Sequence, residues 1–156
     1  MQAVITKLEH GYEAQFDRHL KHPVEKVWTA ITDPDKLAKW LASAKADLRE
    51  GGSLELTFDL TEGNAFACRI TEYKPHAVLE FEWGPEERVR FELYPEDGGC
   101  QLVLKQLFEH KSGQTAKDLA GWHEHLEVLL AVLGGEPAAF SYGAWESWHE
   151  AYLKLL

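Results

Sequence analysis

Eight histidines make metal binding the first chemistry to consider for this sequence. His123 and His125 are two positions apart in a predicted helix over residues 115–133, so their side chains project about 200° apart and cannot share an ion. His19 and His22 have no acid or third ligand at a spacing typical of zinc sites. We therefore predict no metal site.

Trp122 and His125 are three residues apart and lie on one face of the same predicted helix. Two interpretations remain open: a site on that face, or Trp122 in the core with His125 in water at the helix edge. Gln106 falls on the inward side of its strand, where a polar group needs a partner. It would bond either a ligand or nearby backbone. Arg18 and Glu72 also fall on inward positions and could pair with each other.

Recognisable catalytic constellations are not evident. Ser112 lies near His110 without a Gly-x-Ser-x-Gly elbow, and Cys68 is expected inside a sheet, where a thiol is usually inert. The apolar face carries no carboxylate pair for glycosidase-type chemistry. The sequence also lacks a phosphate-cradling glycine loop, so we predict no cofactor.

The excess of acidic residues argues against two classes of binding partner. The chain has 156 residues, with 16 Lys and Arg against 26 Asp and Glu, a net charge of −10. Without a basic cluster, nucleic acid and anionic membrane surfaces are disfavoured, and no apolar run is long enough for a membrane span. No signal peptide is evident, and Cys68 and Cys100 form no metal motif, so we expect reduced thiols and a cytoplasmic protein. A single domain over 1–156 is predicted, as a monomer or a homodimer.

The order of elements follows from the periodicity. Residues 13–20 alternate as a strand, and two short helices follow, the first starting near Pro23 and the second capped by Asp33. Residues 44–110 read as five or six strands with short turns, one of them at residues 62–64. Outward-facing acids on these strands predict that the negative charge forms the solvated outer face of the sheet: Glu55, Asp59, Glu80, Glu82 and Glu92.

The longest helical pattern, residues 115–133, begins at Thr115 and Asp118, which resemble a capping box, and ends at Gly134 and Gly135. A tail helix is expected over 144–156, with Trp145 and Trp148 docked on the same chain. The predicted fold class is α+β: a curved antiparallel sheet wrapped around a long C-terminal helix, with two short helices after the first strand.

Several motifs then resemble a known family. Residues 18–34, including Trp28 and Pro34, resemble the opening of the START-like (SRPBCC, helix-grip) superfamily. More narrowly, residues 70–75, 79–83 and 121–126 resemble the branch named for activators of the ninety-kilodalton heat-shock protein ATPase. The resemblance covers residues 13–135, the predicted domain core.

The resemblance implies a hydrophobic cavity between sheet and long helix, with Trp122 as a wall and His125 as a polar group that orients a ligand. An ordinary packed core is the alternative interpretation of the same residues. The predicted cavity lining is Trp40, Leu56, Phe58, Phe66, Ile70, Leu79, Phe81, Phe91, Leu93, Leu104, Gln106, Trp122, His125, Leu126 and Leu129.

Three functions follow from the resemblance. The first is a binder of an apolar lipid-, polyketide- or aromatic-like small molecule, without assigned catalytic residues. The second is a co-chaperone that activates a heat-shock protein ATPase, although the eukaryotic co-chaperones carry an additional N-terminal domain that is not expected in this sequence. The third is a polyketide-type aromatase or cyclase that would use Gln106 and His125.

Overall fold

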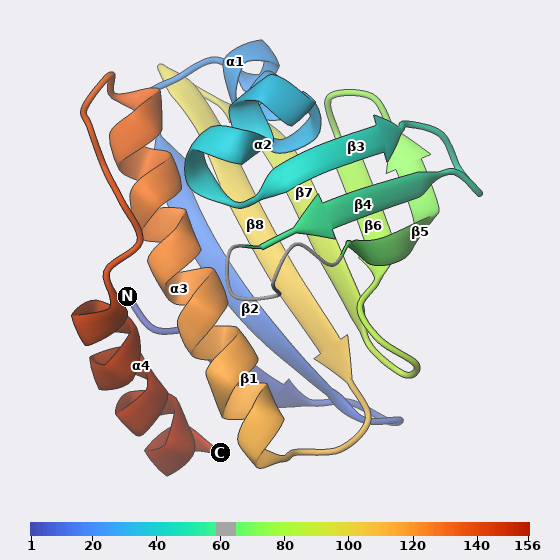
Figure 1. The fold of residues 1–156 in the computed structure, drawn as a ribbon, viewed down its shortest axis with the longest axis vertical. Helices are drawn as coiled ribbons and strands as arrows, with labels where there is room; N and C mark the ends of the chain where they lie inside the picture. Colours follow the sequence, from blue (N-terminus) through green and yellow to red (C-terminus); the bar gives the residue numbers. More distant parts are fainter. Residues whose placement is uncertain (59–64) are drawn as a thin grey trace.

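An eight-stranded antiparallel sheet curves around one long helix, in the order β1-β2-β8-β7-β6-β5-β4-β3 (Figure 1). The structure is a computed structural model that describes residues 1–58 and 65–156, so Asp59 and the predicted turn at 62–64 lie outside it. The strands are β1 (Val4–Lys7), β2 (Tyr12–Leu20), β3 (Ser43–Asp47), β4 (Ser53–Thr57), β5 (Phe66–Lys74), β6 (Val78–Glu82), β7 (Arg88–Glu96) and β8 (Gly99–Phe108). The helices are α1 (Val24–Thr32), α2 (Pro34–Trp40), α3 (Gly113–Leu133) and α4 (Tyr142–Leu155). This α+β arrangement confirms the predicted helix-grip fold.

The edge strand β1 was not predicted. It pairs with β2, so the two short helices follow the second strand rather than the first. Its sequence, VITK, is too short for a clear period, and only Ile5 is partly buried. An edge strand that buries so little leaves almost no alternation for sequence analysis to detect.

Local sequence sets the helix ends. Asp33 caps α2 by accepting a hydrogen bond from the Asp35 amide at 3.0 Å, as predicted. The capping box predicted at Thr115 and Asp118 was wrong: it lies one turn earlier in the sequence. Ser112 is the N-cap of α3, and the side chains of Ser112 and Thr115 each accept a hydrogen bond from the other residue's backbone N–H. The missed signal is a serine three residues before a threonine, which can close the box as Glu does.

The inner sheet face, α3 and α1 enclose the core. Phe16, Phe81 and Leu119 are almost completely inaccessible to solvent. Both cysteines are free and buried, and burial followed by the charge of Glu82 raises the pKa of Cys68 to about 12. Cys68 therefore lies inside the sheet, as expected, and its raised pKa favours the protonated thiol at neutral pH. Among the described residues, no helix is long and apolar enough to cross a membrane.

Helix α4 packs along α3 on the side away from α2 (Figure 1). The Trp148 ring stacks on His123 with 3.7 Å between ring centroids. The Tyr152 hydroxyl accepts a hydrogen bond from the Ala3 amide at 2.9 Å and lies 2.8 Å from His123 Nδ1. Tail docking on the same chain is thus observed, and this contact also ties down the start of the chain.

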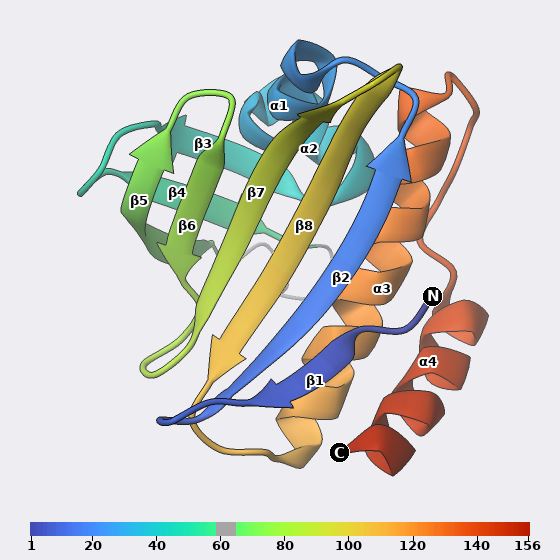
Figure 2. The same ribbon diagram turned by 180° about the vertical axis from the view of Figure 1, so that it is seen from behind.

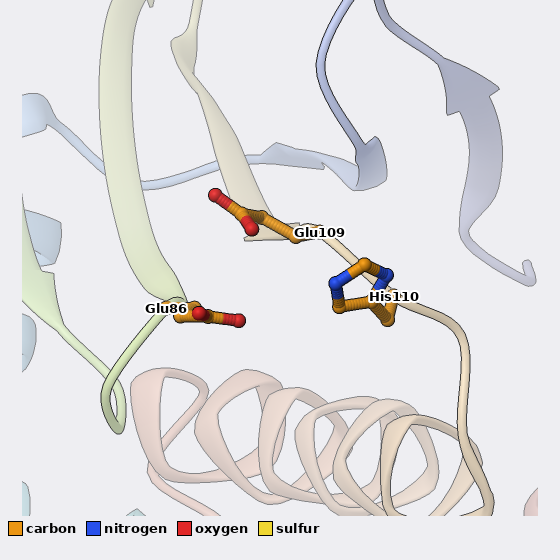
Figure 3. A group of neighbouring side chains, drawn as sticks. All are labelled: Glu86, Glu109 and His110. Carbon is orange, nitrogen blue, oxygen red and sulfur yellow. The ribbon is translucent and has the colours of Figure 1, made fainter.

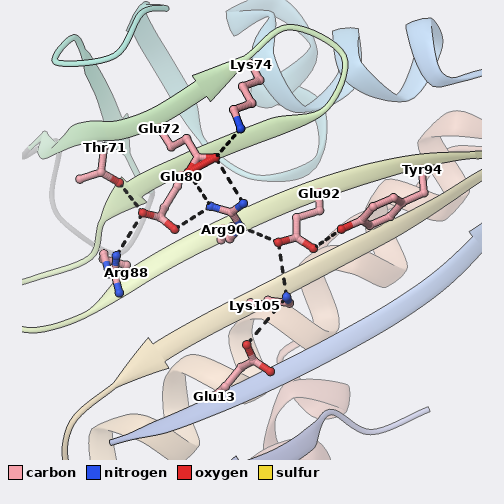
Figure 4. A network of polar contacts seen from close by, with 10 residues as sticks. All are labelled: Glu13, Thr71, Glu72, Lys74, Glu80, Arg88, Arg90, Glu92, Tyr94 and Lys105. Carbon is pink, nitrogen blue, oxygen red and sulfur yellow. Dashed lines mark hydrogen bonds and ion pairs between the residues drawn. The ribbon is translucent and has the colours of Figure 1, made fainter. Parts of the chain in front are cut away.

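The outer sheet face corrects the charge prediction. Figure 2 shows this face without a covering helix, yet Glu80 and Glu92 are buried there. Arg90 bonds both of them and Glu72, and flanking bases extend the network (Figure 4). The ion pairs of the network join four carboxylates to four bases: Glu13, Glu72, Glu80 and Glu92 with Lys74, Arg88, Arg90 and Lys105. Its formal charge is therefore zero, and this part of the face is not the exposed acidic surface that was expected.

The predicted Arg18–Glu72 pair does not form. A register shift between Ile70 and Glu72 turns Glu72 to the outer face, where it meets Arg90. Arg18 instead donates to the backbone carbonyls of Asp17 and Met1, at 2.9 and 3.1 Å. A β-bulge changes which face the following residues occupy, and the simple alternation rule cannot anticipate it.

Candidate functional site

A cleft opens between the N-terminal half of α3 and the nearby ends of β4, β5 and β6. Its outer part has a volume of about 320 Å³, and a smaller inner part of about 100 Å³ shares the side chains of Phe58, Trp83 and Asp118. We call both parts together the Trp83 cleft. Its described lining is Leu41, Phe58, Phe66, Trp83, Gly84, Glu87, Gln114, Lys117, Asp118, Gly121, Trp122 and His125.

Trp83 organises the aromatic wall. Its ring lies 5.0 Å from Phe66 and 5.2 Å from Trp122, measured between centroids. The Trp83 amide donates to the Glu87 carbonyl at 2.8 Å, which closes the turn that follows β6. Gly84 in that turn has φ of +82°, a backbone conformation that favours glycine. The turn therefore fixes the indole at the end of the strand, beside α3.

His125 stands on the inner wall and is not a water-exposed edge residue. It is partly buried, and its Nδ1 lies 3.1 Å from the Trp40 carbonyl, which can only accept a hydrogen bond. Nδ1 therefore carries the proton, and Nε2 keeps its lone pair. Burial lowers the pKa of His125 to about 4, against the opposing effect of the Trp40 hydrogen bond. The imidazole is neutral at pH 7 and can accept a hydrogen bond.

Gln106 links the sheet to α3 at the back of the cleft. Its Nε2 donates to Glu87 at 3.2 Å and to Asp118 at 3.4 Å. Its Oε1 is buried and has no hydrogen-bond partner among the described residues. The sequence predicts that Gln106 bonds a ligand or nearby backbone. In the structure its amide instead donates to two carboxylates.

The same contact corrects the expectation that no carboxylates converge on this side of the sheet. Glu87 precedes β7 and Asp118 lies on α3, so 31 positions of sequence separate them. Burial raises the pKa of Asp118, opposed by polar contacts with Gln114, Gln106 and Trp83. Burial and the negative charge of Asp118 raise the pKa of Glu87, opposed by the Gln106 hydrogen bond. Both acids are therefore more easily protonated than free carboxyl groups.

The predicted lining residues divide into two groups. Phe58, Phe66, Trp122 and His125 line the cleft, and Gln106 contacts it from behind. The rest are buried core residues that do not line it: Trp40, Leu56, Ile70, Leu79, Phe81, Phe91, Leu93, Leu104, Leu126 and Leu129. Strand alternation and helical periodicity placed these residues correctly in the core but could not separate packed positions from open ones.

The most important residues that sequence reasoning missed are Trp83, Glu87 and Asp118. Trp83 falls on the predicted apolar face, immediately before the Gly84-Pro85 turn, and a bulky ring at a strand end next to a turn is the signal that could have identified it. Trp122 was predicted, and its Nε1 is a buried donor without a partner in the described part of the chain.

Two other features are less suited to a ligand. Glu86, Glu109 and His110 come together on exposed loops near the cleft (Figure 3), and all three side chains are solvated. A hollow of about 830 Å³ lies beside β1 and the end of α4, and its lining includes the highly exposed Met1. The Trp83 cleft is smaller than this hollow, but the described residues that line it combine aromatic walls with polar atoms, which is the usual composition of a ligand site.

Comparison with known proteins agrees with the fold. The model of the family described as activator of Hsp90 ATPase homolog 1-like protein matches residues 21–134. No curated protein matches the chain. Among solved structures, CalU16 from Micromonospora echinospora is 24% identical, with TM-score 0.78 over 98% of this chain and 94% of its own.

Two further structures are similar. A conserved protein of unknown function, EF2215 from Enterococcus faecalis, is 21% identical, with TM-score 0.83 over 99% of this chain and 90% of its own. DynU16, a protein of the dynemicin biosynthetic locus, is 25% identical, with TM-score 0.68 over 80% of this chain and 48% of its own.

Proposed function

The chain belongs to the activator of Hsp90 ATPase homolog 1-like family, and on that basis we propose that it binds an aromatic or otherwise apolar small molecule in the Trp83 cleft. The observation that carries the proposal is the cleft's composition. The aromatic rings of Phe58, Phe66 and Trp83 line a space of about 320 Å³, near the lower limit of ligand-site volumes, and Trp122 of α3 lines the smaller inner part. An apolar compound entering it would remove aromatic surface from water.

The polar atoms of the cleft give the ligand an orientation. The Trp122 indole N–H is a donor and the neutral His125 ring an acceptor on the inner wall. Glu87 and Asp118 are acceptors on the outer part. The similarity to DynU16, from a biosynthetic locus, supports a small-molecule role for this fold.

The proposal is tested with N-phenyl-1-naphthylamine, an uncharged fluorophore whose emission rises in apolar sites. Phe66 is 36% exposed, so Phe66→Ala removes part of the wall with little damage to the core. We expect roughly threefold to tenfold weaker binding, from the roughly 0.5–1.5 kcal/mol that an aromatic pair contributes. Leu153→Ala is the control, because Leu153 is 50% exposed on α4 and lies outside the cleft. Equal binding by both variants would place the probe elsewhere and contradict the proposal.

The family's description favours one second candidate, stimulation of Hsp90 ATPase activity. It is tested by adding the purified protein to Hsp90 and measuring ATP hydrolysis. A rate increase that Phe66→Ala leaves unchanged would assign chaperone stimulation to a surface that does not need the cleft wall. An unchanged ATPase rate would remove this candidate.

A further inference from the structure

The outer part of the Trp83 cleft combines two carboxylates with aromatic rings and contains no base among its described lining residues. Glu87 and Asp118 stand beside Phe58, Phe66 and Trp83. Neither carboxylate has a Lys or Arg within ion-pair distance in the described part of the chain. On the outer sheet face, by contrast, every carboxylate of the Arg90 network has a basic partner. No Lys or Arg in the described part of the chain therefore pairs with the two carboxylates of the cleft.

Gln106 donates to both carboxylates from behind the cleft lining. Its amide nitrogen is used by Glu87 and Asp118, and its Oε1 is buried without a partner among the described residues. The two carboxylates that line the outer part of the cleft accept hydrogen bonds, so a ligand that meets them must supply donors.

We propose that the ligand of the Trp83 cleft is an organic cation, an inference that rests on the proposed function. This cation is an aromatic ring system that carries a protonated amine, and the amine is directed at Glu87 and Asp118. An ammonium offers several N–H donors, which match the two carboxylates. Trp83 and Phe66 line the same part of the cleft, and aromatic rings attract a positive charge to their faces through the ring quadrupole.

The competing ligand classes fit this part of the cleft less well. A neutral hydroxyl supplies a single donor and leaves two carboxylates uncompensated. A carboxylate or phosphate would be repelled by Glu87 and Asp118. Lys117, the one Lys or Arg in the described lining, borders the inner part and belongs to the helix surface, where its side chain is exposed.

The test compares two probes with the same ring, 1-naphthylmethylammonium and 1-naphthalenemethanol, by isothermal titration calorimetry at pH 7. We expect the amine to bind about tenfold tighter than the alcohol, the effect of one charge-assisted contact in a partly buried site. Glu87→Gln and Asp118→Asn are each expected to weaken the amine about tenfold and the alcohol no more than about twofold. Glu86→Gln is the matched control, because it removes the same charge one position away, on an exposed residue outside the cleft lining.

The outcomes separate the two proposals. Equal affinity for amine and alcohol, or amine binding that Glu87→Gln and Asp118→Asn leave unchanged, would overturn the organic-cation proposal while cleft binding stands. The comparison of the two probes on the unmodified protein depends on no variant. Failure of both probes to bind would overturn both proposals.

Discussion

Replacing Arg90 by Met tests whether the buried glutamates of the outer sheet face depend on one guanidinium. Arg90 bonds Glu80 at 3.1 Å and also Glu72 and Glu92, and its side chain is only 22% exposed. Breaking a buried ion pair by removing one partner typically costs about 3–5 kcal/mol, because the remaining charge stays buried. Met keeps much of the volume of the apolar stem, so the loss is mainly electrostatic.

The expected magnitude is smaller than that range because the glutamates keep other partners. Glu80 retains Arg88 at 3.3 Å, and Glu92 retains Lys105 at 3.3 Å. We therefore expect a loss of about 2–3 kcal/mol in the free energy of unfolding. Arg69→Met is the control: the Arg69–Glu82 pair is exposed, at 3.6 Å, and should contribute less than about 1 kcal/mol.

The pH dependence gives a second readout. Hydrogen bonding from Arg90 lowers the pKa of Glu72. For Glu92, burial acts to raise the pKa, but hydrogen bonds from Arg90 and Tyr94 act in the opposite direction. The net result is a pKa of Glu92 below its usual value. A lowered folded-state pKa gives stability that is present above the unfolded pKa of about 4.5 and lost as the pH falls through the folded value. The difference between Arg90→Met and the unmodified protein should therefore shrink in acid.

Urea unfolding at pH 7 and at pH 4 measures both quantities. A loss at pH 7 no larger than that of Arg69→Met would show that the network adds nothing beyond exposed pairs. An equal loss at both pH values would show that packing, and not the charges, sets the effect.

Three further predictions concern α3 and its neighbours. Tyr152→Phe removes the hydroxyl that contacts the Ala3 amide and His123 Nδ1, and should lower the free energy of unfolding, measured by thermal unfolding, by about 1–3 kcal/mol. Hydrogen exchange at the Ala3 amide should become faster. An unchanged exchange rate would show that the bond does not hold the N-terminal segment. Gly121→Ala should stabilise the protein by about 0.5–1 kcal/mol, because alanine favours the helix and its Cβ would lie an ordinary 3.9 Å from its nearest neighbour, Trp145 Nε1. A lower free energy of unfolding in urea would show that the added methyl group does not fit. The His125 ring should titrate near pH 4 in an NMR pH titration. The free energy of unfolding should therefore fall as the pH drops from about 6.5, the pKa in the unfolded chain, towards 4. A titration midpoint of pH 6 or above would mean that the ring is exposed to water.

Periodicity predicted what depends on alternating burial. Phe16, Leu79 and Leu126 carry the sheet and helix patterns, and all three are buried where expected. The two short helices and the tail helix followed from Pro23, Asp33 and the Trp145–Trp148 spacing for the same reason: each signal is local in sequence.

The candidate site was less predictable because its parts come from distant positions. Gln106, Glu87 and Asp118 meet only after β8, the turn before β7 and α3 are packed together. The bulge before Glu72 and the partial exposure of Phe66 also depend on strand pairing and strand ends. Composition gave the net charge but not its distribution, so the burial of Glu80 and Glu92 could not be anticipated.

The central claim is that a small aromatic compound occupies the space between Trp83 and α3. The most direct measurement is a ¹⁵N NMR titration of the indole N–H signals with 1-naphthalenemethanol. The structure predicts saturable shifts for Trp83 and Trp122 and none for Trp28, which packs against Tyr73 and His76 away from the cleft. Shifts confined to other indoles, or no saturable shift at Trp83 and Trp122, would contradict the claim.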